Sequence, residues 1–187
     1  MDGYYDRMVT HSLEIPLALC GFIGAGVPQT AAALSALTGL PLIDIERQLE
    51  HHAGAPLHQH FEHPDLKAAE ANLIERALVH RPCGVIALRA SSLNDRKVAA
   101  LIEAKAQLIY LHRDVFYLFS QVQQMRRQDV LLRSLELTDR QQSNIAEMAT
   151  VFRRWEPQYL GAKQVVYAEN MRGIKVAQQL IRMIPEL

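Results

Sequence analysis

The sequence predicts an α/β domain in which a five-stranded parallel sheet carries helices on both faces. Three observations lead to this fold class. Five short apolar runs recur along the chain, stretches with helical periodicity separate them, and a cluster of glycines follows the first run directly. Strands that alternate with helices pair in parallel, and the helices then cover both faces of the sheet. A strand followed by a glycine turn and a helix is the usual opening of such an arrangement.

Each predicted strand is a short apolar run bounded by turn or helix signals, as expected for strands buried on both faces. The predicted strands are Ile15–Cys20, Leu40–Ile45, Val85–Leu88, Leu108–Leu111 and Val165–Ala168. The predicted helices are Pro28–Gly39, Arg47–Ala53, Leu66–His80, Asn94–Ala106, Asp114–Met125, a helix from Thr138 to about Arg154, and Arg172–Met183. Local signals support two helix starts: Pro28 suits a first turn, and Thr138 with Gln141 forms a capping box.

The length and composition indicate one globular domain without affinity for polyanions. The chain has 187 residues, which favours a single domain, and we expect residues 1–12 to be a short lead-in to a domain at 13–187. The formal net charge is zero, so neither nucleic acid nor an anionic membrane surface is an expected partner. No apolar run approaches the roughly 20 residues of a membrane-spanning helix, and the first residues lack a signal-peptide pattern.

The two cysteines, Cys20 and Cys83, lie in or beside apolar runs. Small buried thiols in a reducing compartment are the simplest interpretation. A disulfide or a reactive thiol is the alternative. Buried, reduced thiols and the absence of a signal-peptide pattern together predict a cytoplasmic protein.

The glycine turn from Gly21 to Thr30 is the most informative motif. A phosphate-binding loop has the form G-x-x-x-x-G-K-[ST] between a strand and a helix. Gly21 and Gly26 have this spacing, with Val27 at the lysine position and Pro28 at the hydroxyl position. The candidate phosphate loop therefore consists of Gly21, Gly24, Ala25, Gly26, Val27, Pro28 and Gln29.

Both replacements remove groups that phosphoryl transfer uses. The loop lysine follows negative charge onto the transferred group, and the hydroxyl holds Mg²⁺. Valine has no charge, and proline lacks both a hydroxyl and a backbone N–H. The loss of one preorganised donor typically costs about 2.7–4 kcal/mol of transition-state stabilisation. The sequence alone also allows a turn that serves only tight packing.

The rest of the chain resembles shikimate kinases, from about Leu17 to the C-terminus. Residues 37–54 resemble the second strand and following helix of that family, with Asp44 and Glu46 in place of its D-x-D acids. Residues 108–122 resemble the fourth strand and the helix leading to the lid, and residues 130–138 the end of the lid. The segment EPQY, at Glu156–Tyr159, resembles the R-x-P-L-Y stretch. The resemblance implies a P-loop kinase fold with a lid and a shikimate pocket beside the second strand.

The resemblance also implies roles for residues at matching positions. The family transfers the γ-phosphate of ATP to the 3-hydroxyl of shikimate. Asp44 stands where the family has the acid near Mg²⁺, and it is the candidate metal residue. Glu46 stands at the acid that binds substrate hydroxyls, and Lys67 at a substrate-binding arginine. Lysine cannot form the bidentate fork that arginine makes with a carboxylate.

Several positions depart from the family pattern. The G-G-G stretch after the third strand is Arg89-Ala90-Ser91, and the second substrate arginine is Trp155. Side chains at these positions would enter the pocket, so the candidate ligand pocket consists of Glu46, Lys67, Arg89 and Trp155. Arg89 either pairs with a surface acid, or it fills the altered pocket or contacts an anion there. In the lid, R-P-L-L becomes Asp129-Val130-Leu131-Leu132, and the nearby cations are Arg126, Arg127 and Arg133.

Five of the eight histidines lie between His51 and His63. A solvated surface is the simplest interpretation of this cluster. A metal site or a pH-sensing role is the alternative, since His58 and His60 would project the same way from an extended segment.

Three functions follow from these patterns. The first is a shikimate kinase-like pseudokinase with a degenerate phosphate loop that senses a small ligand or binds a protein. The second is a divergent ATP-dependent small-molecule kinase in which Arg126, Arg127 or Arg133 replaces the loop lysine and Asp44 holds the metal. The third is a regulatory partner of an active kinase. Mg·ATP is an expected cofactor only if nucleotide binding survives the loss of the lysine.

Overall fold

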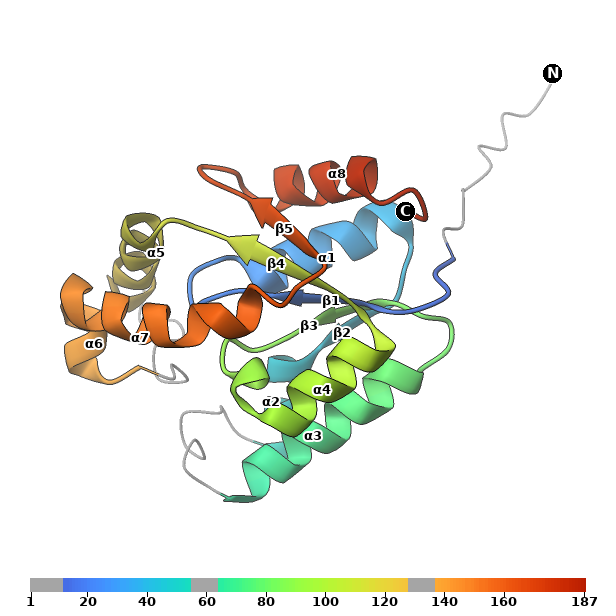
Figure 1. The fold of residues 1–187 in the computed structure, drawn as a ribbon, viewed down its shortest axis with the longest axis horizontal. Coiled ribbons are helices and arrows are strands. Elements are labelled where there is room, and N and C mark those ends of the chain that lie inside the picture. Colours follow the sequence, from blue (N-terminus) through green and yellow to red (C-terminus); the bar gives the residue numbers. More distant parts are fainter. Residues whose placement is uncertain (1–11, 55–63, 128–136) are drawn as a thin grey trace.

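The computed structural model describes residues 12–54, 64–127 and 137–187. Its centre is a parallel five-stranded sheet in the order β2-β3-β1-β4-β5, which confirms the predicted fold class (Figure 1). The strands are β1 (Leu17–Cys20), β2 (Leu42–Asp44), β3 (Val85–Ala87), β4 (Gln107–His112) and β5 (Gln164–Tyr167).

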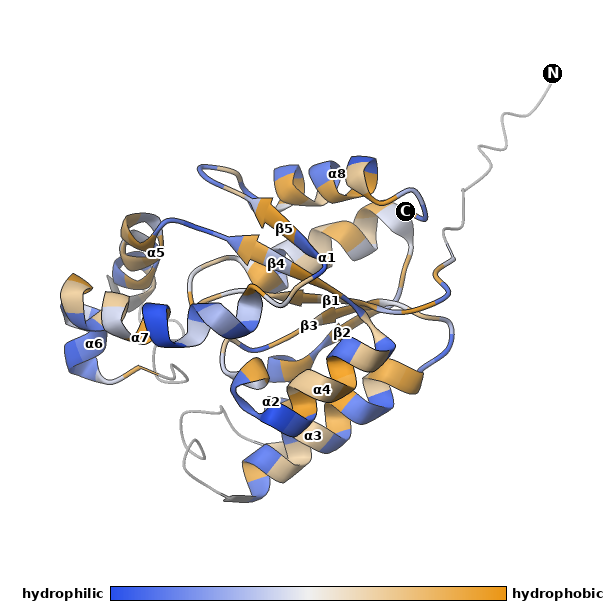
Figure 2. Cartoon of the chain, viewed as in Figure 1, coloured by the Kyte–Doolittle hydropathy of each residue, from blue (hydrophilic) through white to orange (hydrophobic). Residues whose placement is uncertain are grey.

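The central strands are buried on both faces, which explains why their sequences are continuous apolar runs rather than alternating ones. All four residues of β1 are fully buried, and Leu17 pairs with Val85 on one side and with Gln107 on the other. Hydrophobic residues therefore concentrate on the strands and on the sides of the helices that face them (Figure 2).

Helices cover both faces of the sheet. On one face lie α1 (Val27–Thr38) and α8 (Gly173–Met183), which pack against each other (Figure 1). The approach is close where they begin, since a Cβ at Gly173 would lie 2.9 Å from the carbonyl carbon of Gln29. The opposite face carries α3 (Pro64–Val79), α4 (Arg96–Lys105) and α7 (Ile145–Tyr159).

The remaining helices lie near the carboxyl ends of the strands. Directly after β2, α2 (Ile45–Ala53) begins, and α5 (Val115–Arg127) follows β4. The short α6 (Asp139–Ser143) leads into α7, and the 3-10 helix η2 (Ser92–Asn94) precedes α4. The connections at this edge of the sheet therefore surround the glycine turn that follows β1.

One predicted helix is two helices in the structure. The capping box of Thr138 and Gln141 is present, but it starts the five-residue α6. Asn144 then adopts an extended backbone, and its side chain accepts hydrogen bonds from the N–H groups of Ala146 and Glu147, which starts α7. The prediction of one helix from Thr138 to about Arg154 was therefore wrong, because an asparagine cap competes with helix continuation.

The structure also bears on the membrane question. Across the described parts of the chain, none of the helices combines the length and apolar character that crossing a bilayer requires.

Candidate functional site

The glycine turn adopts a compact loop between β1 and α1. Gly24 and Gly26 have positive φ angles of 86° and 81°, which side chains other than glycine rarely adopt. The Ala25 N–H donates to the Phe22 carbonyl at 2.9 Å, which closes a turn within the loop. A Cβ at Gly24 would lie 3.1 Å from the Leu118 carbonyl oxygen, so α5 packs directly on the loop. The glycines thus serve both the loop conformation and this contact.

Val27 and Pro28, at the positions where the phosphate-loop pattern has a lysine and a hydroxyl residue, have no polar side-chain group. Val27 is only 4% exposed, and its Cγ2 lies 3.2 Å from the position of a Cβ at Gly21, so it packs back on the loop. Pro28 is exposed in the first turn of α1, where it contributes neither a hydroxyl nor an N–H. Gln29, also exposed, completes this turn.

A cavity of about 140 Å³, the loop cavity, lies against the glycine turn. Its walls are loop residues between Gly21 and Gln29, the segment Leu88–Ala90, Glu46 from α2 and Met125 from α5. The volume is below the roughly 300–1,000 Å³ of typical ligand pockets. Among the described residues of this lining, Arg89 is the only one with a cationic side chain.

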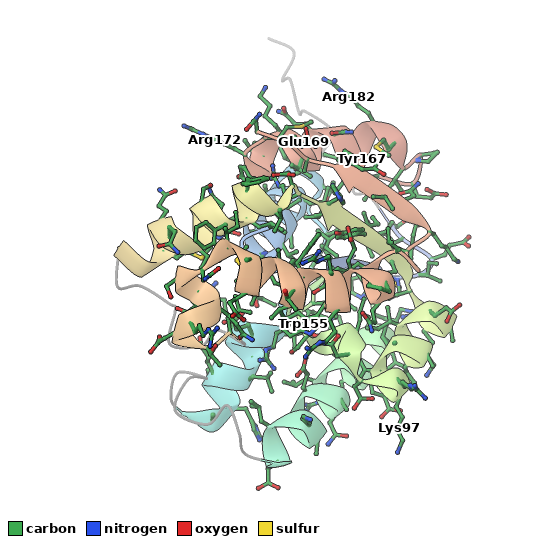
Figure 3. The ribbon with its side chains drawn as sticks, turned by 60° about the vertical axis from the view of Figure 1, so that its left-hand side comes forward. Lys97, Trp155, Tyr167, Glu169, Arg172 and Arg182 are labelled. Atoms are coloured by element: carbon green, nitrogen blue, oxygen red, sulfur yellow. The ribbon has the colours of Figure 1, made fainter. Side chains whose placement is uncertain are left out.

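A larger cavity of about 400 Å³, the ligand cavity, lies between α3, α4 and α7. Its lining includes Lys67, Arg89 and Trp155, three of the four residues predicted for the pocket, while the fourth, Glu46, lines the loop cavity. Figure 3 shows Trp155 projecting from α7 toward the side of the molecule that holds α3 and α4. Arg89 lines both cavities and therefore forms part of the wall between them.

Arg89 belongs to a buried hydrogen-bond network with Glu70 and Ser92. Arg89 Nη1 lies 2.7 Å from Glu70 Oε2, Ser92 Oγ donates to Glu70 Oε1 at 2.6 Å, and the Arg89 N–H donates to Ser92 Oγ at 3.1 Å. All three residues are buried, so the pair is poorly screened by solvent. Arg89 does form an ion pair, but the predicted surface acid was wrong, because its partner Glu70 is buried. Glu70 was not predicted, because a single acid on a helix carries no sequence signal for burial.

An aromatic cluster connects the glycine loop to α7. The ring of Phe22, in the loop, packs edge-on against Phe152 at 5.3 Å and lies 5.5 Å from Trp155. A second contact comes from Tyr159, whose hydroxyl donates to the Ala90 carbonyl at 2.6 Å. Consequently α7 holds both the loop and the segment after β3.

Arg113 was also not predicted, although it forms a hydrogen bond with the same loop. It is 2% exposed, and its guanidinium donates to the carbonyls of Ala25 at 3.3 Å and Met171 at 2.7 Å. The guanidinium also lies over the Tyr117 ring, 4.6 Å from the centroid. In the sequence, a lone arginine after a strand resembles any surface cation, so only the tertiary structure reveals its burial and its hydrogen bonds.

Comparison with known proteins places this chain in a family. The model of the shikimate kinase family matches residues 23–185. The chain belongs to the shikimate kinase family. No match was found among curated proteins.

Solved shikimate kinases share the fold at low sequence identity. The shikimate kinase of Acinetobacter baumannii in complex with shikimate has a TM-score of 0.81 and 17% identity, over 95% of this chain and 97% of that chain. The enzyme of Bacteroides thetaiotaomicron has a TM-score of 0.77 and 16% identity, over 92% and 99%. The enzyme of Aquifex aeolicus has a TM-score of 0.70 and 13% identity, over 89% and 94%.

The candidate metal residue, Asp44, caps a helix. Its side chain accepts a hydrogen bond from the Arg47 N–H at 3.2 Å and caps α2. Asp44 is not in the lining of the loop cavity or the ligand cavity. Among the residues the structure describes, no group of three or more His, Cys, Asp or Glu could hold a metal ion.

The side chains of the predicted lid cations, and three of the five clustered histidines, lie outside the described residues. Arg126 and Arg127 end α5, with side chains outside the description, and Arg133 lies beyond it altogether. His51 and His52 are exposed in the last turns of α2. Outside the described residues are His58, His60 and His63.

Proposed function

We propose that this member of the shikimate kinase family does not transfer phosphate and instead acts as a small-ligand sensor or regulatory binding protein. The observation that carries the proposal is the pair Val27 and Pro28 at the start of α1. A buried valine replaces the cation that stabilises the transferred phosphoryl group, and proline replaces the Mg²⁺-binding hydroxyl. The fold that would hold two substrates is retained, while the loop chemistry is absent.

The wall between the two cavities supports the same proposal. Phosphoryl transfer requires the acceptor hydroxyl to approach the γ-phosphate in line. Here the buried Arg89 side chain, paired with Glu70, forms part of the boundary between the loop cavity and the ligand cavity. Binding a ligand on one side of this boundary needs no contact with the other side.

The competing function is a divergent kinase that uses lid arginines and Asp44 with Mg·ATP. The N-cap role of Asp44 favours the non-catalytic alternative, because the carboxylate is already engaged with the first turn of α2. We further propose that the protein acts in the cytoplasm on a small molecule or a protein partner. Its formal net charge of zero argues against nucleic acid or a membrane surface as a partner.

The melting temperature, measured with and without Mg·ATP, tests the proposal. A ligand at 100 times its Kd stabilises a protein by about 2.7 kcal/mol, which raises the melting temperature by roughly 5–10 °C for this chain length. We expect no such rise for the native protein at millimolar Mg·ATP. The double variant Val27→Lys/Pro28→Ser, which restores the loop motif, is the positive control and should gain the rise.

Turnover decides between the two functions. With Mg·ATP and shikimate, we expect no ADP release above the rate without protein. ADP release at a rate typical of small-molecule kinases, about 1–100 per second, would overturn the proposal.

A further inference from the structure

The strand β5 forms one edge of the sheet, because β4 lies on one side of it and no described strand lies on the other. Figure 1 shows β5 at the margin of the sheet, beside α8. An edge strand presents backbone N–H and C=O groups that can pair with a further strand. Tyr167, the last residue of β5, has an exposed fraction of 62%, so its side chain is open to a partner.

The pairing of β5 with β4 decides which of its backbone groups face outward. The Ala168 N–H donates to the His112 carbonyl of β4 at 3.1 Å, so the backbone groups of Ala168 point into the sheet. Direction alternates from residue to residue along a strand. The groups of Val166 therefore also point into the sheet, whereas those of Val165 and Tyr167 point outward. A further strand could pair with these two residues without disturbing β4.

An antiparallel copy of β5 fits these groups when a two-fold axis passes through Val166. In that register, Val165 of each copy lies opposite Tyr167 of the other, and each such pair can exchange both of its backbone hydrogen bonds. A β-branched and an aromatic side chain directly opposite each other also favour pairing. The two contacts are identical by symmetry, as in an isologous dimer interface.

The charges that flank β5 are complementary in this register. Lys163 lies three residues before Val166, and Glu169 lies three residues after it, so the axis brings each to the opposite charge on the other copy. Both residues are exposed, and neither has an ion pair or hydrogen bond with another residue in the described ranges. Within one chain, the four residues of β5 hold them roughly 13 Å or more apart. A second copy therefore supplies the counter-charges that each chain lacks.

We propose that β5 pairs antiparallel with β5 of a second copy of this chain, with Lys163 of each copy at Glu169 of the other. This inference goes beyond the proposed function and does not depend on it, because no residue of β5 lines the loop cavity or the ligand cavity. The paired edge is short, so we expect a transient dimer with a Kd on the order of tens of micromolar.

Sedimentation equilibrium of the native chain, from micromolar to near-millimolar concentration, tests whether the dimer forms. We expect the mean mass to rise with concentration from 21.1 kDa toward twice that value. A chain that stays at 21.1 kDa over the whole range would overturn the inference.

Charge reversal tests the register. Lys163→Glu places like charges at both contacts, and so does Glu169→Lys, so each variant alone should raise the Kd of self-association at least about tenfold. An equimolar mixture of the two variants restores both opposite-charge contacts and should associate with close to native affinity. The double variant Lys163→Glu/Glu169→Lys restores them within one sequence and should do the same.

The matched control is Lys97→Glu, a reversal at an exposed residue of α4. Figure 3 shows Lys97 at the opposite end of the molecule from Tyr167 and Glu169, so this variant should keep the native Kd. Melting curves check that every variant is folded. Self-association that the single reversals leave unchanged, or single variants that do not associate with each other when mixed, would also overturn the inference.

Discussion

Arg89 is a buried cation between the two cavities of this shikimate kinase fold. It stands at the first position of a stretch that is glycine in the family pattern, and its side chain, 5% exposed, lines both cavities. A buried cation needs a fixed anion, and Glu70 provides it from α3. Glu70 therefore neutralises the charge of Arg89 and holds its side chain in the wall between the cavities.

Removing Glu70 should destabilise the protein strongly. Glu70→Ala leaves the buried guanidinium without its anion, and we expect the free energy of unfolding to fall by about 3–5 kcal/mol. Urea denaturation measures this loss. The exposed acid of the same helix provides the control, since Glu75→Ala should change stability by no more than about 0.5 kcal/mol.

Removing both partners should cost much less. Glu70→Met/Arg89→Met replaces the ion pair with apolar side chains of similar length, which is often neutral for a buried pair. If the double variant is as unstable as Glu70→Ala alone, then packing rather than charge pairing explains the effect.

At the scale of elements, α7 contacts both the glycine loop and the segment after β3. Its Phe152 and Trp155 support the glycine loop through Phe22, and its Tyr159 holds the Ala90 carbonyl. The start of this helix depends on Asn144, whose side chain receives two backbone N–H groups. This cap therefore fixes where α7, the helix that carries Trp155, begins.

Substitution of the cap should weaken α7. Asn144→Ala removes the capping oxygen, and we expect a loss of about 1 kcal/mol in the free energy of unfolding. Asn144→Ser keeps a capping oxygen and should retain most of the stability. Equal losses in the two variants, measured by thermal denaturation, would mean that the cap does not hold the start of α7.

At the scale of the whole molecule, the sheet buries ionisable groups that must stay neutral. Cys20 lies in the central strand, where burial raises the pKa of its thiol well above the ordinary value of 9.0. Burial, and next the charge of Glu156, raise the pKa of Tyr110 in the neighbouring strand well above the ordinary 10.0. Both groups therefore resist ionisation while the protein is folded.

The sign of the resulting pH dependence follows from linkage. Both pKa values are higher in the folded than in the unfolded chain, so their stabilising contribution is complete below pH 9.0 and is lost as pH rises beyond it. We expect the free energy of unfolding to decline from pH 9.0 upward, and Cys20→Ala to flatten the first part of the decline. Urea titrations at increasing pH measure this, and a stability that rises with alkaline pH would contradict it.

The sequence by itself determined the order and type of most elements. Continuous apolar runs predict strands buried on both faces, and the spacing of Gly21 and Gly26 predicts a loop between strand and helix. These signals are local, so they could be recognised without knowledge of the fold. The split between α6 and α7 was missed because the asparagine cap at Asn144 competes with a sequence that would also suit a continuous helix.

Only the tertiary structure decided how the side chains pair. The family resemblance predicted one pocket for Glu46, Lys67, Arg89 and Trp155, whereas in the structure Glu46 lines a different cavity from Lys67 and Trp155. Glu70 and Arg113 carry no local signal, because what makes a charged residue important here is burial against a partner far along the chain. Burial and pairing are properties of the assembled core, and a list of residues in chain order does not contain them.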